Sequence, residues 1–287
     1  MNPFRQYVSE FATLQAKGAS LPLGACQPQT RPTPKAGAPS AMIFSPHPDD
    51  EAIVGGLPLR LLRERGMRII NVAVTAGSDP ERRSERLEEA RCCCDVLGFE
   101  LKVLGGAGLE RVDLRRREED PGSWLISVES VVEAILDGRP DVVFFPHDTD
   151  QHRAHIGTHY LLVDALERLP HACGFYTVET EFWGALAAPN LAVELSVEDA
   201  GDLVGALSFH RGEVVRNPYH LRLPAWMMDN VRRGVELVGG SGAPAPEFVY
   251  AVLYRLRRWE RGRFRNILER GRFLSAAENA GVLFPHF

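Results

Sequence analysis

Cysteine is scarce in this sequence, and its distribution excludes a disulfide-stabilised scaffold. The 287 residues contain five cysteines, an odd number, and three of them are adjacent at Cys92, Cys93 and Cys94. A framework of paired disulfides needs an even count of cysteines at separated positions. The triplet lies within a helical pattern, where cysteine usually packs as a small apolar side chain, so we assign it no metal or redox chemistry.

The sequence also lacks long apolar runs and an excess of positive charge. No stretch approaches the roughly 18 apolar residues of a membrane span, and the first twenty residues lack the apolar core of a signal peptide. We therefore expect a soluble, cytoplasmic protein without an integral membrane segment. The net charge of −5 argues against a partner such as nucleic acid, which requires a strongly basic face. A small molecule is the expected partner, and a homo-oligomer is compatible with the sequence.

Prolines separate an N-terminal segment from the rest of the chain. They occur at positions 22, 28, 32, 34 and 39, which is typical of an irregular segment. We expect residues 1–40 to form an N-terminal extension with a proline-rich lead-in. Residues 41–287 should form a single domain, since a chain that is 45% hydrophobic can bury one large core. Within it, residues 41–180 are the expected core and residues 181–287 a C-terminal elaboration.

Apolar strands alternate with helical patterns through the core. We predict strands at residues 41–44, 68–75, 100–104, 141–146 and 174–180, and helices at 57–65, 80–97, 123–136 and 156–169. Continuous apolar strands separated by helices are typical of parallel sheets covered on both faces. The predicted fold class is therefore Rossmann-like α/β, with a mainly parallel sheet.

The C-terminal elaboration should add helices and strands, although its topology stays open. The pattern predicts a helix at 196–215 and a strand at 248–253. The run 254–272 carries eight arginines mixed with acidic and apolar residues, so we interpret it as a solvated face and not as a phosphate-binding tract. Two other stretches, 210–211 and 216–220, have the polar and aromatic mix of a sugar-binding rim, and equally that of a helix end and a turn.

Two polar clusters directly follow apolar strands, at the edge of the sheet where α/β proteins bind ligands. The first is His47-Pro48-Asp49-Asp50-Glu51, and the second is the run 147–155, which contains three histidines. Catalytic zinc commonly takes three ligands from His, Asp and Glu. His47 and Asp50 could meet one ion, and a histidine of the second cluster would complete the set.

The remaining carboxylates of the first cluster then have distinct roles. Asp49 would be free of the metal and able to take a proton from water, while a second histidine protonates the departing amine. Glu51 could orient a metal ligand by contacting that ligand without binding the metal itself. The alternatives are a helix N-cap for the first cluster and a solvated surface loop for the second.

At these residues the sequence resembles the family of zinc-dependent N-deacetylases that includes LmbE-like proteins and N-acetylglucosaminyl-phosphatidylinositol deacetylase. The family carries a Pro/Ala-His-Pro-Asp-Asp-Glu signature after its first strand, which Pro46–Glu51 matches in full. Its second motif, His-x-x-His at the start of a helix, matches His152–His155. The resemblance covers roughly residues 41–169, and it implies one zinc ion per chain, with another divalent metal as the alternative.

Carried over by position, the resemblance implies a metal set of His47, Asp50 and His155. It implies Asp49 as the general base. His152 would be the general acid, or would stabilise the tetrahedral oxyanion together with the metal. A His155/His159 pair at i, i+4 is an alternative ligand set, and His147 is also close.

Two further positions follow from the same resemblance. The family often has an aspartate directly before its second metal histidine, where this chain has Ala154, and we expect Asp150 to replace its effect on the imidazole. The family's second helix often carries Arg-x-x-Glu before a Leu-Gly stop, which Arg86, Glu89, Leu97 and Gly98 match. Arg86 is thereby a candidate substrate contact, or else an ordinary exposed helix arginine.

The expected function is hydrolysis of an acetyl group from an N-acetylated amino sugar or its conjugate. The first alternative is an amidase acting on a thiol-sugar conjugate or another small amide through the same metal site. The second is a non-catalytic sugar-binding protein of the same fold. An intact Asp49 beside complete metal ligands argues against the second alternative, because binding alone does not need a free base.

Overall fold

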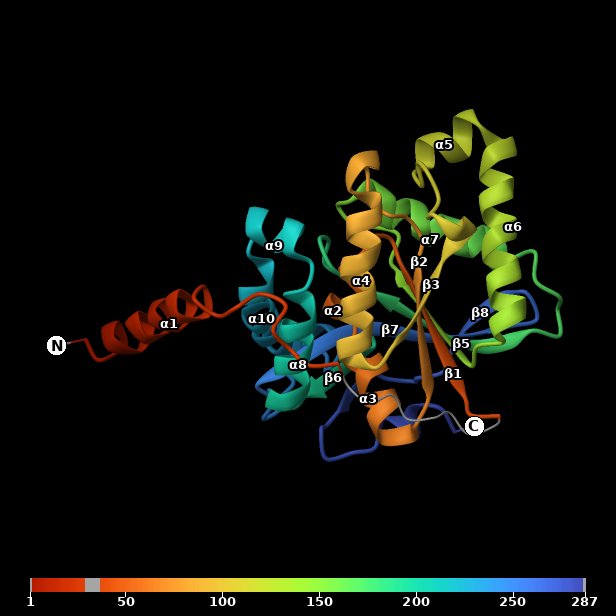
Figure 1. Cartoon of the computed structure of the whole chain (residues 1–287). Helices are drawn as coiled ribbons and strands as arrows, with labels where there is room; N and C mark the ends of the chain where they lie inside the picture. The colour runs from red at the N-terminus through yellow and green to blue at the C-terminus, as the bar shows by residue number, and fades with distance from the viewer. Residues whose placement is uncertain (1, 29–36, 286–287) are drawn as a thin grey trace.

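A nine-stranded sheet forms the centre of the molecule in the computed structural model, which describes residues 2–28 and 37–285 (Figure 1). Its order is β3-β2-β1-β4-β5-β7-β6-β9, and β8 pairs with β7. The strands are β1 (Ser40–Ser45), β2 (Arg68–Ala73), β3 (Glu100–Val103), β4 (Val142–Pro146), β5 (Gly174–Thr180), β6 (Leu191–Leu195), β7 (Tyr250–Glu260), β8 (Arg263–Asn266) and β9 (Arg272–Leu274).

Helices connect and cover these strands. They are α1 (Phe4–Gly18), α2 (Asp50–Ile53), α3 (Gly56–Arg65), α4 (Arg83–Leu97), α5 (Leu114–Glu119), α6 (Pro121–Gly138), α7 (Arg153–Leu166), α8 (Val197–Leu207), α9 (Arg211–Arg216) and α10 (Leu223–Leu237). Short 3-10 turns are η1 (Pro80–Arg82), η2 (Leu104–Gly106), η3 (Tyr219–Leu221) and η4 (Ala280–Leu283). Gly66 and Gly98 end α3 and α4 in left-handed conformations, which a glycine adopts without a steric penalty.

The strands β3, β2, β1, β4 and β5 run parallel to one another, and the sheet has an apolar core on each face. On β1, Ala41 and Ile43 belong to the core beneath α3, α4 and α8, whereas Met42 and Phe44 belong to the core beneath α6 and α7. Alternate side chains of a strand point to opposite faces, so both faces are covered. The predicted Rossmann-like, mainly parallel α/β fold is confirmed.

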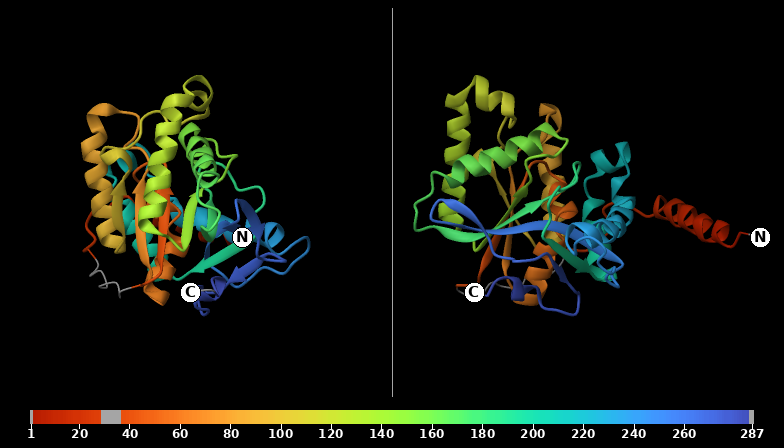
Figure 2. Two further views of the ribbon diagram at one scale, coloured as in Figure 1. Left: turned by 90° about the vertical axis from the view of Figure 1, so that its right-hand side faces the viewer. Right: turned by 180° about the vertical axis from the view of Figure 1, so that it is seen from behind.

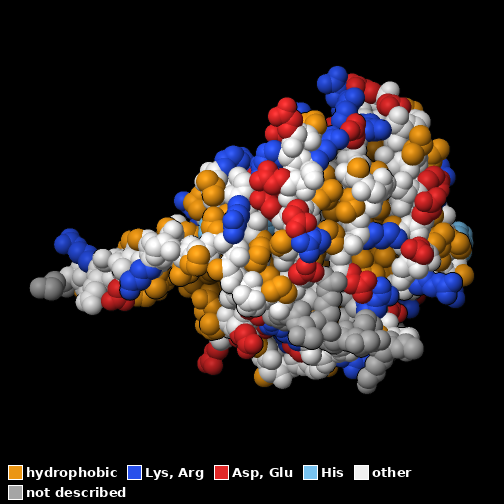
Figure 3. All heavy atoms as spheres, viewed as in Figure 1, with side chains coloured by type: hydrophobic (Ala, Val, Ile, Leu, Met, Phe, Trp, Pro, Cys, Tyr) orange, Lys and Arg blue, Asp and Glu red, His pale blue; other side chains and the backbone are white. Residues whose placement is uncertain are grey.

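The C-terminal part extends the sheet with antiparallel pairing, which the sequence did not predict. β7 runs antiparallel to both β5 and β6, and β6 pairs parallel with β9. Most of the arginine-rich run lies in β7 and β8, where Arg255 and Arg257 pair with Glu179 of β5. Figure 3 shows charges of both signs mixed over one face of the molecule. The interpretation of this run as a packed and solvated face fits these contacts.

The prediction of one continuous helix at 196–215 is wrong, because residues 208–210 separate two helices. α8 ends at Leu207, α9 begins at Arg211, and His210 lies between them as the residue that precedes α9. The Ser208 hydroxyl donates to the carbonyl oxygen of Gly205, which satisfies a backbone group at the end of α8. This break directs His210 into the protein interior.

The N-terminal helix α1 projects from the body of the molecule, as Figures 1 and 2 show from opposite sides. None of its residues is buried. Prolines 32 and 34 of the expected lead-in lie outside the described residues. Within the described ranges, no helix has the length and apolar character needed to cross a bilayer.

Candidate active site

The two polar clusters lie together because their strands are neighbours. β1 pairs parallel with β4, so the loops that follow these strands leave the sheet at the same edge. One loop leads into the four-residue helix α2, and the other leads into α7, which begins after His152. The first histidine of one loop and the last two histidines of the other converge, with one nitrogen each of His47, His152 and His155 lying within 4.8 Å of one another.

Asp50 lies between two of these imidazoles. Its Oδ2 atom is 3.6 Å from His47 Nδ1 and 3.5 Å from His155 Nε2. Ligand atoms around a tetrahedral ion with bonds near 2.1 Å are about 3.4 Å apart, so the spacing fits one zinc-sized ion. The predicted set of His47, Asp50 and His155 is thus brought together.

Two buried polar atoms of this group lack a hydrogen-bond partner among the described residues, although Asp50 Oδ2 accepts the His47 N–H at 2.8 Å. Asp50 Oδ1 and His155 Nε2 are buried and have no hydrogen-bond partner. Burial alone would raise the pKa of Asp50, but His155 and His47 lower it to about 2, so the carboxylate is ionised. A buried carboxylate and a buried imidazole nitrogen left unsatisfied beside each other are suited to a divalent cation.

Asp150 holds the other side of His155. Its Oδ2 atom is 3.6 Å from His155 Nδ1, and its two oxygens also accept backbone N–H bonds from His152 and Gly184. A carboxylate behind a metal-binding histidine fixes the orientation of the ring and leaves its other nitrogen for the metal. This placement agrees with the expectation that Asp150 compensates for Ala154.

The two remaining histidines of this region face elsewhere. His159 directs Nδ1 at the carbonyl oxygen of Pro146, at 2.9 Å. His147 is fully buried, and its Nε2 lies 2.9 Å from the carbonyl oxygen of Gly184. The geometry therefore does not support the alternative His155/His159 ligand pair.

Asp49 has a strained backbone and a protected carboxylate. Its φ of 123° and ψ of −29° fall where side chains are rarely accommodated, at a cost on the order of 1–3 kcal/mol. The Tyr219 hydroxyl donates to its Oδ2 at 2.6 Å, and the guanidinium of Arg86 lies 3.6 Å from the same oxygen. Burial and then the neighbouring Asp50 raise the pKa of Asp49 to about 6, against opposing effects of His210 and Arg86.

Arg86 contacts the loop that carries Asp49. Its Nη2 donates to the carbonyl oxygen of Pro48 at 2.9 Å, and its Nε is 4.0 Å from Glu213 of α9. The residue is buried, with 9% of its surface exposed, so it is not an ordinary exposed helix arginine. Its predicted role as a substrate contact stays a prediction, and its contacts favour holding Asp49.

Glu51 is buried behind Asp49. Its Oε2 accepts the backbone N–H of Asp49 at 2.9 Å, and its Oε1 accepts a hydrogen bond from His210 Nε2 at 2.9 Å. Glu51 therefore contacts the backbone of Asp49, and its predicted role in orienting a metal ligand stays a prediction.

His152 is the most exposed of the converging histidines. Its Nδ1 accepts the N–H of Ala154, which leaves Nε2 to carry the proton of the neutral ring. Burial, followed by the adjacent His47 and His155, lowers the pKa of His152 to about 4. At neutral pH the ring is uncharged and can donate one hydrogen bond from Nε2.

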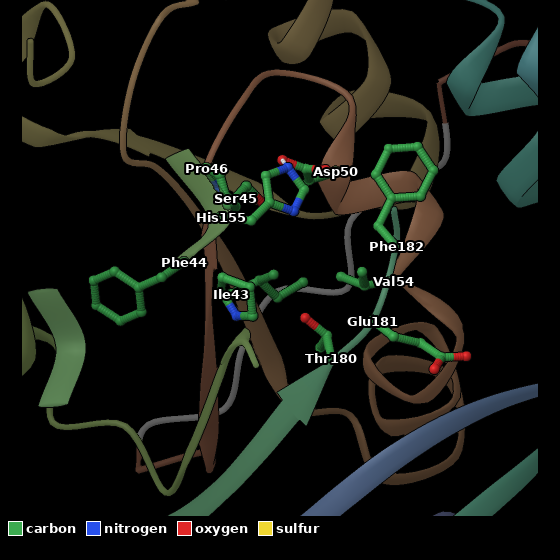
Figure 4. A pocket seen from close by; sticks show the side chains of 11 residues that line it. Ile43, Phe44, Ser45, Pro46, Asp50, Val54, His155, Thr180, Glu181 and Phe182 are labelled. Atoms are coloured by element: carbon green, nitrogen blue, oxygen red, sulfur yellow. Dashed lines mark ion pairs between the residues drawn. The ribbon is translucent and has the colours of Figure 1, made fainter. Parts of the chain in front are cut away.

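An apolar wall lies behind and beside the donor group. Figure 4 shows the His155 ring next to Asp50, above a pocket lined by Ile43 and Val54. This pocket has a volume of about 10 Å³, close to the minimum for a single water molecule. The Phe182 ring centroid is 6.1 Å from that of His155 and 4.4 Å from that of Trp183, whose side chain is 48% exposed.

Sequence reasoning missed the roles of three residues in the segment 210–219. His210, Glu213 and Tyr219 reach Glu51, Arg86 and Asp49 respectively. The sequence offers only a weak signal for two of them, because residues 210–211 and 216–220 have the composition of a sugar-binding rim and equally that of a helix end and a turn. Glu213 lies outside both stretches. In the structure Tyr219 contacts Asp49, and His210 contacts Glu51.

Comparisons with known proteins agree with this architecture. Residues 42–166 match the family described as PIG-L, GlcNAc-PI de-N-acetylase. The uncharacterized deacetylase YaiS of Escherichia coli (strain K12) is 24% identical over 142 residues, which are 48% of this chain and 74% of YaiS.

Two solved structures share the fold. N,N'-diacetylchitobiose deacetylase from Pyrococcus horikoshii has a TM-score of 0.56 at 17% identity, covering 89% of this chain and 93% of that chain. The zinc inhibited form of teicoplanin deacetylase Orf2 has a TM-score of 0.56 at 16% identity, covering 77% of this chain and 98% of that chain. The family match spans nearly the same residues as the resemblance found from the two motifs, and residues 42–166 therefore carry a PIG-L, LmbE-like domain.

Proposed function

We propose that this protein is a metal-dependent hydrolase that removes the acetyl group from an N-acetylated amino sugar or its conjugate. The observation that carries the proposal is the position of Asp49. It lies directly beside Asp50 but points away from it, to Tyr219 and Arg86, so it is free of the donor set. A metal-binding protein without catalysis would have no use for a strained, buried carboxylate at this point.

The donor set His47, Asp50 and His155 would hold one zinc ion, or another divalent metal. Such an ion, when bound, polarises an amide carbonyl and makes water a better nucleophile. The chemistry of the donors, two imidazoles and one carboxylate, is typical of catalytic zinc sites that leave a position open.

Asp49 would move the proton of the reaction. A pKa of about 6 leaves its carboxylate mostly ionised at neutral pH and still basic enough to accept a proton from the attacking water. As the carbon–nitrogen bond breaks, the same carboxyl group can return that proton to the departing amine. The products are acetate and the free amine, and Asp49 is restored.

His152 would contribute a hydrogen bond. Of its two candidate roles, general acid and stabilisation of the oxyanion, the low pKa of His152 favours the second, because the neutral ring donates from Nε2 without giving up the proton. Arg86 would hold Pro48 and Asp49 in place.

An amino sugar suits the surroundings of this site. Trp183 presents a half-exposed ring beside Phe182, and an aromatic face packs against the apolar face of a sugar ring. The proteins of similar fold named above include deacetylases of a chitobiose derivative and of teicoplanin, which supports a sugar conjugate.

Replacing Trp183 by Ala should raise KM several-fold with little change in kcat, measured on the best substrate. An unchanged KM would remove Trp183 from the binding site.

A substrate screen separates the proposal from its alternatives. Acetate release should be measured with zinc-loaded protein on N-acetylglucosamine, chitobiose-type conjugates, and amides of thiol-bearing sugars. Turnover on the N-acetyl sugars supports the deacetylase. Turnover on the thiol-sugar amides alone supports the amidase. Silence on every compound, together with measurable sugar binding, supports the non-catalytic protein.

A further inference from the structure

The conformation of Asp49 must be imposed by its surroundings. At φ 123° and ψ −29° the residue lies outside the regions that side chains normally adopt, and such a conformation persists only where neighbouring contacts fix it. The contact on its backbone comes from Glu51, whose Oε2 accepts the Asp49 N–H at 2.9 Å. Glu51 thereby fixes the peptide that precedes the carboxylate.

Glu51 is in turn fixed by His210. The Nε2 of His210 donates to Glu51 Oε1 at 2.9 Å, and both side chains are completely buried. Burial opposes protonation of His210, but the carboxylates of Glu51 and Asp49 more than offset it, so the pKa of His210 is raised above its usual value. The backbone of His210 is anchored as well, since its carbonyl oxygen accepts bonds from Glu213 and Val214 at the start of α9.

This cluster does not have the form of a second metal site. Glu51, Cys93 and His210 offer ligand atoms within 4.8 Å of one another and are all buried. Both oxygens of Glu51 are nevertheless engaged at hydrogen-bond distance, one with His210 and the other with the Asp49 N–H. Burial and the neighbouring Glu51 also raise the pKa of the Cys93 thiol, so the thiol stays protonated and is a poor metal ligand.

We propose that His210 is a positioning residue for Asp49, acting through Glu51. The inference rests on the proposed role of Asp49 as the base. His210 lies 159 residues from Glu51 in the sequence and comes from the break between α8 and α9. Its hydrogen bond fixes Glu51 in the rotamer that accepts the Asp49 N–H. Without this hydrogen bond Glu51 can change rotamer, the strained peptide can relax, and the carboxylate of Asp49 moves away from the position in which it would act as the base.

The test compares two substitutions at position 210. His210→Phe keeps the size of the ring and removes the donor, whereas His210→Gln keeps a donor at the position of Nε2. Crystal structures of both zinc-loaded variants should show Asp49 out of the positive-φ region in His210→Phe and retained there in His210→Gln. Since a displacement near 1 Å costs about 100-fold in rate, kcat should fall by about that factor in His210→Phe with little change in KM. His210→Gln should recover most of it.

A matched control is His159→Phe. His159 is also a buried histidine beside a carboxylate: its Nδ1 lies 2.9 Å from the Pro146 carbonyl oxygen and 3.7 Å from Glu179 Oε1, and neither partner contacts Asp49. It should leave the Asp49 torsion angles unchanged. If His210→Phe leaves them equally unchanged and keeps full kcat, the positioning role is wrong. A second metal ion bound by Glu51, Cys93 and His210 in anomalous diffraction would also overturn it.

Loss of the donor leaves Glu51 as a buried, unpaired charge, and His210→Phe could fail to fold for that reason. The double variant Glu51→Gln/His210→Phe contains no such charge and permits the same measurements. We expect Asp49 to leave the positive-φ region there too, and its retention would contradict the proposal.

The torsion and metal readouts need no substrate, so the two proposals can fail separately. If Asp49 relaxes in His210→Phe while the wild type releases no acetate from any substrate, the positioning contact stands and the deacetylase function falls. If the wild type releases acetate and Asp49 keeps its torsion angles in His210→Phe, the deacetylase function stands and the positioning role of His210 falls.

Discussion

The loops after β1 and β4 and the distant segment 210–219 contribute to the site in different ways. The loops supply every atom of the proposed metal donor set, with Asp50 placed 3.5–3.6 Å from one nitrogen of His47 and one of His155. The segment supplies no atom of that set and instead contacts the proposed base Asp49, through Tyr219 on its carboxylate and through His210 on Glu51. The proposed metal site and the proposed base therefore depend on separate parts of the chain, and each can be perturbed without the other.

The largest effect should come from removing the base and nothing else. Asp49→Asn is nearly isosteric, and asparagine tolerates positive φ comparatively well. We expect kcat to fall about 10²–10⁴-fold, the usual contribution of a general base. Equilibrium dialysis should show that zinc still binds. Full activity of the variant would eliminate Asp49 as the base, and loss of zinc would mean that the metal and base functions are not separate.

The next effect should appear in metal affinity alone. Asp150→Asn keeps an acceptor for only one of the two backbone N–H groups, those of His152 and Gly184, and loses the charge behind His155. Weakening such a contact typically costs 10–100-fold in metal affinity, so we expect the Kd for zinc to rise by about that factor. Asp148→Asn, an exposed residue of the same loop, is the matched control. Equal zinc binding by both variants would show that Asp150 does not support the metal.

A smaller effect should come from the segment 210–219. Tyr219→Phe removes the hydroxyl that donates to Asp49 at 2.6 Å. A hydrogen bond to a charged group is worth about 1.5–3 kcal/mol, so we expect kcat to fall about 10- to 100-fold, with zinc affinity unchanged.

Tyr254→Phe is the control for that variant. The Tyr254 hydroxyl is also buried, but it bonds to the backbone of Val54 and Leu57. Its loss should lower the free energy of unfolding by about 1–3 kcal/mol while leaving kcat intact. Should Tyr219→Phe behave in the same way, lowering stability but not kcat, the segment is merely structural.

The same division explains what could be predicted from the sequence. The strands of the core and the motif residues are local features: apolar runs define the strands, and the loop that follows each strand lies at a known edge of a parallel sheet. For that reason the clusters that contain His47, Asp50 and His155 could be expected at the same edge of the sheet. The choice of His155 and Asp150 within the second cluster came from the resemblance to the deacetylase family, and their roles toward a metal stay predictions. The parallel core was predicted on the same basis.

The contacts of the segment 210–219 could not be predicted. His210 and Tyr219 meet their partners across 159 and 170 residues, and no spacing rule connects positions so far apart. The antiparallel strands β6 and β7 bring this part of the chain onto the sheet, and their pairing is set by tertiary packing. The sequence pattern predicts one continuous helix at 196–215, so it gives no sign of the break before α9 that directs His210 inward.

The most direct test of the central claim is a zinc titration of the metal-free protein, with bound ion and acetate release followed together. We expect one zinc per chain, activity that rises in proportion to it, and the loss of both in His155→Ala. A protein that binds no stoichiometric divalent ion, or that releases acetate equally well without one, would contradict the account.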